Sequence, residues 1–291
     1  MSSTDAQPES RPKVTTPQIR DRKGGPKLTM VTAYDYPSAR IADEAGVDMI
    51  LVGDSVANVV HGHETTLGMD LETMILHTAA VVRARPKALV VADLPWLTYH
   101  VSVEDTIRNA GRLVREGEAE AVKLEGGRKR VQMVTALVDT EIPVMGHIGL
   151  TPQSVHAMGG YRVQGKLVEE ARDLIADSQA LEAAGIFALV LEGVPGLVAE
   201  IITKELSIPT IGIGAGVGTD GQVLVFHDVL GLTYGRQPRF VRRFADLHGE
   251  AVRGIAAFRS AVESGSFPND SETYHLDSEV AEVLLKDSRS D

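Results

Sequence analysis

The sequence predicts an α/β protein that folds as a closed (β/α)8 barrel of the TIM type. Three observations favour this fold: short β-rich runs recur along the chain, most gaps between them show helical periodicity, and the runs are continuously apolar. Continuous apolar strands that alternate with amphipathic helices indicate a parallel sheet covered by helices. Seven or eight such units favour closure over an open doubly wound sheet, whose Gly-x-Gly-x-x-Gly turn does not follow the first strand here.

Eight strand runs are predicted, each a short apolar stretch bounded by turn residues. The last run is the weakest, because only a few residues separate it from the seventh and leave no room for an ordinary helix. Either one unit of the barrel is abbreviated, or the eighth strand is misplaced. The predicted strand runs are residues 28–35, 48–55, 88–95, 121–127, 142–149, 187–194, 209–216 and 221–228.

Helical periodicity fills most of the gaps between these runs. The longest insertions follow the second and fifth strands, at residues 57–70 and 150–166. Both lie on the carboxyl side of their strands, where barrel enzymes carry the loops of their active sites. The predicted helices cover residues 36–46, 71–84, 102–117, 128–140, 168–185 and 197–206.

Composition divides the chain into one domain and two flanking segments. Residues 1–25 are polar and rich in Ser, Thr and Pro, which predicts a flexible N-terminal arm with one short helix near Thr16–Arg22. Residues 26–265 form the predicted single (β/α)8 barrel catalytic domain, and a chain with 43% hydrophobic residues can bury its core. Residues 266–291 form an acidic C-terminal tail, in which VAEVLL, residues 280–285, could dock as a short helix.

Charge and cysteine content exclude several classes of function. Lys and Arg total 29 against 40 Asp and Glu, so the net charge of −11 argues against a nucleic-acid or anionic-membrane partner. The absence of cysteine rules out disulfides, thiolate nucleophiles and cysteine metal sites. No N-terminal apolar region resembles a signal peptide, and no run approaches the roughly 18 apolar residues of a membrane span. We therefore expect a soluble, cytoplasmic protein.

Several apolar strand runs end on a charged or titratable residue. The carboxyl ends of barrel strands converge on one mouth, so these side chains should point towards a common space. Carboxylates crowded there would repel one another, and a divalent cation would remove the repulsion. With oxygen ligands and no cysteine, Mg²⁺ is the best match. The residues are Asp54, Asp93, Glu125, His147 and Glu192.

Each of these residues also fits a structural role. Zinc is disfavoured, because His61 and His63 lie in a loop and no HExxH motif is present. The glycines of residues 212–216 could cradle a phosphate or simply let loops pack closely. Recurrence at equivalent strand ends favours an active site, because structural charges have no reason to share one rim. The structural roles are a turn or helix cap for Asp54 and Asp93, an ion pair for Lys123 and Glu125, and a hydrogen bond or salt bridge for His147 and Glu192.

Five motifs along the barrel carry a resemblance to a known family. They are followed by TIGIGAG and DGQVLVFHDVLGL, and together they span roughly residues 14–265. In this order they resemble ketopantoate hydroxymethyltransferase, also called 3-methyl-2-oxobutanoate hydroxymethyltransferase. The acidic tail is not explained by the resemblance. The motifs are VGDS, ADLP, VKLEGG, GHIGLTPQS and LEGVP.

The resemblance implies a fold of the phosphoenolpyruvate mutase/isocitrate lyase-like superfamily and a Mg²⁺-dependent reaction. A hydroxymethyl group would pass from 5,10-methylenetetrahydrofolate, the co-substrate, to 3-methyl-2-oxobutanoate (α-ketoisovalerate). The products would be 2-dehydropantoate (ketopantoate) and tetrahydrofolate, formed through a Mg-stabilised enolate in pantothenate (vitamin B5) and coenzyme A biosynthesis. The resemblance also implies a homo-oligomer, a decamer in this family.

The resemblance assigns roles to residues at matching positions. It places Mg²⁺ on Asp54, Asp93 and Glu125, in part through water. It makes Glu192 the proton acceptor. The loops at residues 61–69 and 151–166 have the right length to close over the mouth and exclude water. The implied substrate-binding residues are Asp54, Ser55, Asp93, Lys123 and His147.

Two other functions compete with this one. A Mg²⁺-dependent lyase or mutase that cleaves or rearranges C–C bonds of a 2-oxo acid would share the acidic rim. Such enzymes generally use a cysteine or other acid on a closing loop, and this chain has no cysteine. The second is a barrel that only binds a metabolite, without turnover. In that case Glu192→Gln should cause no loss beyond a loss of binding.

Overall fold

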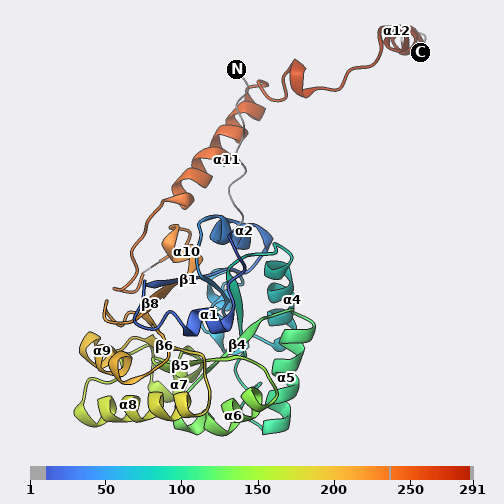
Figure 1. Cartoon of the computed structure of the whole chain (residues 1–291). Helices are drawn as coiled ribbons and strands as arrows, with labels where there is room; N and C mark the ends of the chain where they lie inside the picture. The colour runs from blue at the N-terminus through green and yellow to red at the C-terminus, as the bar shows by residue number, and fades with distance from the viewer. Residues whose placement is uncertain (1–10, 236, 289–291) are drawn as a thin grey trace, which may run out of the picture. The chain divides into compact units, whose positions relative to one another are not determined.

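The computed structural model describes residues 11–235 and 237–288. Its sheet is a closed barrel of eight parallel strands in chain order, in which β8 pairs with β1 (Figure 1). All eight predicted strand runs are confirmed, including the eighth. The strands are β1 (Leu28–Thr32), β2 (Met49–Val52), β3 (Leu89–Asp93), β4 (Ala121–Glu125), β5 (Val144–Gly149), β6 (Ala188–Glu192), β7 (Thr210–Ile213) and β8 (Gly221–Leu224).

The six predicted helices are confirmed, and Figure 1 shows α4, α5, α6, α8 and α9 around the outside of the strands. Local sequence explains where several of them begin. The side chains of Asp35, Asp70 and Ser102 each accept a hydrogen bond from the backbone N–H three residues later, which satisfies a donor that a helix start leaves free. The bounds are α2 (Tyr36–Glu44), α4 (Leu71–Val82), α5 (Val103–Arg115), α6 (Val131–Asp139), α8 (Val168–Ala183) and α9 (Gly196–Glu205).

Shorter helices lie within the loops. Two of them lie in each of the long insertions that follow β2 and β5, so these loops are partly structured. The unit between β7 and β8 is abbreviated, because residues 214–220 form only turns, and the alternative of a misplaced eighth strand is wrong. The short elements of the barrel are α1 (Thr16–Arg20), α3 (Val56–Val59), η1 (Thr66–Gly68), η2 (Arg128–Arg130), η3 (Pro152–Ser154), α7 (Val155–Met158) and α10 (Phe226–Val229).

Alternating side chains give the barrel two apolar cores. Successive side chains of a strand point to opposite faces, so Leu89 and Val91 of β3 pack in the interior while Val90 and Ala92 pack against the helices. Ile19 of α1 is 1% exposed and belongs to the interior cluster, as Leu28 and Met49 do. The interior is therefore filled by side chains, and only the ends of the barrel are open to ligands.

The N-terminal segment contacts the amino ends of the strands. Arg11 donates to the Val47 carbonyl at 2.7 Å, and the backbone N–H of Val14 donates to the Lys87 carbonyl at 2.7 Å. The predicted short helix is confirmed as α1. Residues 1–10 of the predicted flexible arm lie outside the described residues, and the boundary at residue 25 stays a prediction.

The chain divides into two compact units. Among the described residues, the first comprises 11–229, 233–235 and 237–243, and the second comprises 230–232 and 244–288. The second unit holds α11 (Leu247–Glu263), η4 (Asp270–Glu272) and α12 (Ser278–Asp287), and the helix expected at residues 280–285 lies within α12.

The long helix α11 was not predicted, although Val252, Ile255, Phe258 and Val262 recur every three or four residues. The predicted boundaries of the barrel domain, residues 26–265, and of the tail, residues 266–291, stay predictions. In the part of the chain that the structure describes, no helix is long and apolar enough to cross a membrane.

Candidate active site

The predicted residues at the strand ends meet at the carboxyl mouth of the barrel. Lys123 and Glu125 follow Ala121 in the inward-facing alternation of β4, so they continue the interior wall above the apolar layers. In the register of the sheet, Asp93 lies beside Lys123 and Glu125 beside His147. The strand runs end on charges because the barrel interior changes there from an apolar filling to a polar mouth.

Asp54, Asp93 and Lys123 form one half of the site. The backbone N–H of Asp54 donates to Asp93 Oδ2 at 3.0 Å, and Lys123 Nζ forms an ion pair with Asp93 Oδ1 at 3.0 Å. All three residues are at most 5% exposed. Burial opposes the charge of Lys123, but Asp93, Glu125 and Asp54 together raise its pKa, so the ammonium group stays charged.

Glu125, His147 and Glu192 form the other half. The His147 ring lies between two carboxylates, with Nδ1 3.4 Å from Glu125 Oε1 and Nε2 3.2 Å from Glu192 Oε2. Burial and the charge of Lys123 oppose protonation, but Glu125 and Glu192 outweigh them and raise the pKa of His147 to about 9. Lys123 Nζ lies 3.2 Å from His147 Nδ1, so the two halves adjoin. Both groups are cations, and the charge of Glu125 stabilises both of them.

Ser55 and Gly53 shape the space beside the acids. Ser55 Oγ forms a hydrogen bond with the Tyr34 hydroxyl at 2.8 Å. A Cβ on Gly53 would lie 2.8 Å from Ser55 Oγ and 3.5 Å from Asp93 Oδ2. Glycine at this position therefore keeps room open between a hydroxyl and a carboxylate at the mouth.

Two residues of the network were not predicted from the sequence. Gln153 donates its side-chain amide to Asp54 Oδ2 at 2.8 Å and its backbone N–H to Glu125 Oε2 at 3.0 Å. The Tyr99 hydroxyl donates to Gln153 Oε1 at 2.5 Å. Gln153 lies inside the GHIGLTPQS motif and could have been found there, whereas nothing in the sequence around Tyr99 singles it out.

The acids fit a magnesium ion that keeps water in its coordination shell. Burial, and then the charges of Asp93 and Glu125, raise the pKa of Asp54 to about 8. The cations of the cluster therefore do not neutralise all of its acids. Asp93 Oδ1 is buried and faces the Lys123 ammonium group at 3.0 Å, so a carboxylate oxygen already meets a cation at this position. Within the described chain no three Asp, Glu, His or Cys side chains surround one point closely enough to ligate an ion alone. Magnesium commonly uses one or two carboxylates and several waters, which suits this arrangement.

The loop histidines lie in a separate group. His61 Nε2 contacts His77 Nε2 at 3.1 Å, and His77 Nδ1 donates to the Tyr34 carbonyl at 2.6 Å. The rings of His61 and His63 are 6.1 Å apart. These contacts are made with one another and with the backbone, and not with the acidic network.

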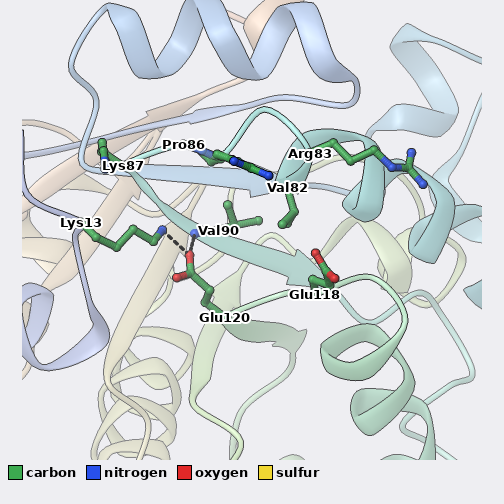
Figure 2. A pocket seen from close by; sticks show the side chains of 9 residues that line it. Lys13, Val82, Arg83, Pro86, Lys87, Val90, Glu118 and Glu120 are labelled. Atoms are coloured by element: carbon green, nitrogen blue, oxygen red, sulfur yellow. Dashed lines mark hydrogen bonds and ion pairs between the residues drawn. The ribbon is translucent and has the colours of Figure 1, made fainter. Parts of the chain in front are cut away.

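A hollow of about 550 Å³ lies at the opposite end of the barrel (Figure 2). Lys13, Lys87 and Glu118 line it, and Figure 2 shows Glu120 bound to Lys13 and to the backbone of Val90. The contacts of Glu120 Oε2 are 2.5 Å to Lys13 Nζ and 2.9 Å to the Val90 nitrogen. These residues are at the amino ends of β3 and β4, whereas barrel enzymes place their chemistry at the carboxyl ends.

The barrel fold resembles that of solved structures from the phosphoenolpyruvate mutase/isocitrate lyase superfamily. A 2,3-dimethylmalate lyase described as a member of that superfamily is 17% identical, with a TM-score of 0.54 over 95% of this chain and 99% of that chain. A phosphoenolpyruvate phosphomutase from Streptomyces platensis subsp. rosaceus is 14% identical, with a TM-score of 0.56 over 95% and 97% of the two chains. At such low identity these structures show the fold alone.

The family follows from closer relatives. Residues 13–270 match the model of the ketopantoate hydroxymethyltransferase family. A 3-methyl-2-oxobutanoate hydroxymethyltransferase of Koribacter versatilis is 52% identical over 275 residues, which are 94% of this chain and 93% of the relative. The enzyme of the same name from Geobacter metallireducens is 54% identical over 253 residues, 87% and 95% of the two chains. The chain belongs to the ketopantoate hydroxymethyltransferase family.

Proposed function

We propose that this chain transfers a hydroxymethyl group from 5,10-methylenetetrahydrofolate to 3-methyl-2-oxobutanoate in pantothenate biosynthesis. The products are 2-dehydropantoate and tetrahydrofolate, and one water supplies the new hydroxyl group. The observation that carries the proposal is the buried network that joins Asp54, Asp93, Lys123, Glu125, His147 and Glu192 at one mouth. Two relatives named 3-methyl-2-oxobutanoate hydroxymethyltransferase, whose sequences are 52% and 54% identical to this chain, support it.

Asp54 and Asp93 would hold Mg²⁺ directly, and Glu125 would hold it through water. Bound Mg²⁺ would draw electron density from the keto oxygen of the substrate and make its C3 hydrogen more acidic. The two aspartates suit this role because they follow β2 and end β3, and the backbone N–H of Asp54 already bonds Asp93.

Lys123 and Ser55 would bind the 2-oxo acid. The raised pKa of Lys123 keeps an ammonium group at the mouth, which attracts the substrate carboxylate and keto oxygen. Ser55 offers its hydroxyl and backbone N–H beside the space that Gly53 leaves free. One buried cation and one hydroxyl therefore fix the direction in which the substrate lies.

Glu192 would accept the C3 proton. Its side chain is 15% exposed, more than the other acids of the network, so it reaches the part of the mouth that a substrate enters. His147 Nε2 lies 3.2 Å from Glu192 Oε2 and forms an ion pair with it when protonated. The electron pair left on C3 would then form the new bond to the methylene carbon of the folate as one of its two C–N bonds breaks and the bonding pair moves to that nitrogen. Water would replace the second nitrogen on this carbon, which leaves the hydroxyl group on the product and releases tetrahydrofolate. His147 would hydrogen-bond the hydroxyl group that forms or the nitrogen that leaves.

The loop of residues 151–166 would close over the bound substrates and exclude water. Burial, and then the charges of Asp54, Glu192 and Glu125, raise the pKa of Tyr161, which indicates that this loop residue lies over the acidic mouth. Residues 61–69 would cover the other side. Exclusion of water protects a reactive one-carbon unit from hydrolysis.

Hydrogen exchange tests the proposed proton transfer. The protein is incubated in D₂O with Mg²⁺ and 3-methyl-2-oxobutanoate, without folate, and the C3 proton signal is followed by NMR. We expect the signal to disappear, and we expect Glu192→Gln to abolish the exchange while the 2-oxo acid still binds. If the substrate binds to the unaltered protein and its C3 proton persists, proton abstraction at this site is wrong. If Glu192→Gln loses binding and exchange equally, the role of Glu192 as proton acceptor is wrong.

We also infer a homo-oligomer, a decamer as in the family, that works in the cytoplasm. The second unit supports association, since α11 carries Val252, Ile255, Phe258 and Val262 at helical spacing. An apolar helix face of this kind suits a contact with another surface. Sedimentation velocity measures the state directly, and a monomer at micromolar concentration would contradict the inference.

A further inference from the structure

We infer that Gln153, oriented by Tyr99, is a positioning residue that sets the directions of two carboxylates in the proposed magnesium site. The inference rests on the proposed function, because it concerns the same acids. It adds two residues to which the sequence motifs assign no role. Gln153 is 5% exposed and Tyr99 is fully buried.

Gln153 joins the ends of three strands from the loop that follows a fourth. Its Nε2 donates to Asp54 Oδ2 after β2 at 2.8 Å and to the Leu94 carbonyl after β3 at 3.0 Å. Its backbone N–H donates to Glu125 Oε2 at the end of β4 at 3.0 Å. The residue thus holds one oxygen of Asp54 and one oxygen of Glu125. It leaves Asp54 Oδ1 for another partner, while Glu125 Oε1 faces His147 Nδ1 at 3.4 Å.

Tyr99 decides which way the amide of Gln153 faces. Its hydroxyl donates to Gln153 Oε1 at 2.5 Å and accepts from the backbone N–H of Glu125 at 3.2 Å. With the amide reversed, Gln153 Oε1 would face the Leu94 carbonyl, which can only accept a hydrogen bond. The Tyr99 hydroxyl would also lose its acceptor. Only one orientation therefore satisfies all the buried groups.

A neutral amide suits this position better than a cation. A lysine or arginine beside Asp54 and Glu125 would neutralise the acids and compete with a divalent ion for them. An amide donates hydrogen bonds without adding charge, so it fixes the carboxylates and leaves their negative charge for the metal. Groups that orient metal ligands in this way typically change metal affinity about 10- to 100-fold when they are removed.

The test is the Mg²⁺ affinity of the full-length Gln153→Met variant, measured by calorimetry without substrate. Methionine keeps the length of the side chain and the backbone N–H but removes the amide. We expect the dissociation constant for Mg²⁺ to rise about 10- to 100-fold. Hydrogen exchange at C3 should fall at low Mg²⁺ and return as Mg²⁺ is raised, a recovery that a damaged fold would not show.

The matched control is Gln179→Met on α8. Gln179 Nε2 donates to Glu205 Oε2 at 2.9 Å on the surface, so this variant loses the same kind of bond away from the site. Its Mg²⁺ affinity should equal that of the unaltered protein. A Gln153→Met protein that binds Mg²⁺ within twofold of that value overturns the inference.

Tyr99→Phe provides a second variant that removes a single oxygen atom. It should weaken Mg²⁺ binding by less than Gln153→Met, because the amide can still reach Asp54 in one of its two orientations. If Gln153→Met does not fold, as judged by circular dichroism, unchanged Mg²⁺ affinity in Tyr99→Phe overturns the inference. An unaltered protein that binds Mg²⁺ but does not exchange the C3 proton would contradict the proposed function and leave this inference standing. Absence of Mg²⁺ binding by the unaltered protein would overturn both.

Discussion

The two ends of the barrel handle charge in opposite ways. At the amino end, Lys13 pairs with Glu120 and Arg11 with Asp43, and every one of these side chains is at least 21% exposed. At the carboxyl end, Asp54, Asp93 and Glu125 are at most 5% exposed, and the acids share one lysine and one histidine. Water and one-to-one pairing satisfy the first group, while the second retains excess negative charge. Charged residues at the two ends of one barrel can therefore either stabilise the fold by pairing or leave the negative charge that a bound cation needs.

Of the substitutions that test this contrast between the two ends, Lys123→Met should have the largest effect on stability and on activity. The substitution leaves the buried Asp93 carboxylate without its cation, and breaking one partner of a buried ion pair costs about 3–5 kcal/mol of the free energy of unfolding. We expect a large drop in stability by urea unfolding and loss of C3 hydrogen exchange. A variant that unfolds within 1 kcal/mol of the unaltered protein would show that the mouth tolerates its charge without Lys123.

The next largest effect should be a change of Mg²⁺ affinity with pH. Because burial and neighbouring acids raise the pKa of Asp54 to about 8, the metal-free protein binds a proton there at neutral pH, and the metal must displace it. Mg²⁺ affinity should therefore fall up to about tenfold for each pH unit below 8 and level off above it. Calorimetry in buffers of different ionisation enthalpy would measure the released proton, and a pH-independent affinity between pH 6 and 8 would contradict the prediction.

The same raised pKa has a consequence for folding. A carboxyl group that binds its proton more tightly in the folded state stabilises that state at low pH, and this contribution is lost as pH rises through the folded pKa. The metal-free protein should lose stability between about pH 4 and pH 8, and Mg²⁺ should restore it. In Asp54→Asn this part of the pH dependence should disappear from thermal unfolding curves.

Gly53→Ala should have a smaller and more local effect. The added methyl group would stand 2.8 Å from Ser55 Oγ and 3.5 Å from Asp93 Oδ2, so it would occupy space proposed for the substrate. We expect KM for 3-methyl-2-oxobutanoate to rise by about tenfold, the equivalent of roughly 1.4 kcal/mol, while the thermal midpoint changes little. An unchanged KM would mean that the substrate lies elsewhere in the mouth.

Lys13→Ala at the amino end should have the smallest effect. Lys13 and Glu120 are 37% and 34% exposed, and pairs in contact with water usually contribute about 0–1 kcal/mol. Hydrogen exchange at C3 should stay unchanged. A loss of stability as large as that of Lys123→Met would erase the contrast between the two ends.

Much of the barrel and its acidic mouth could be predicted because the signals are local. An apolar run that ends on Asp93 or Glu125 identifies both the strand and its polar end, and side-chain alternation then sets the facing. The roles of these residues still depend on the resemblance and stay proposals. The missed helix α11 carried a visible pattern, since its apolar residues recur at helical spacing.

Tyr99 and Gln153 could not be deduced from the sequence in the same way. Their hydrogen bonds join residues 26 to 99 positions apart, and they depend on the paths of two loops, which strand and helix periodicity does not describe. Long-range polar contacts of this kind appear only once the fold brings the loops together.

The pairing of β8 with β1 has a consequence for how the protein is made. Leu28 pairs with Gly221, so the first strand keeps one open edge until most of the polypeptide has left the ribosome. At ordinary rates of translation this interval lasts roughly 10 to 40 s. An unpaired edge invites strands of other nascent chains, so newly made copies should depend on chaperones before the ring closes.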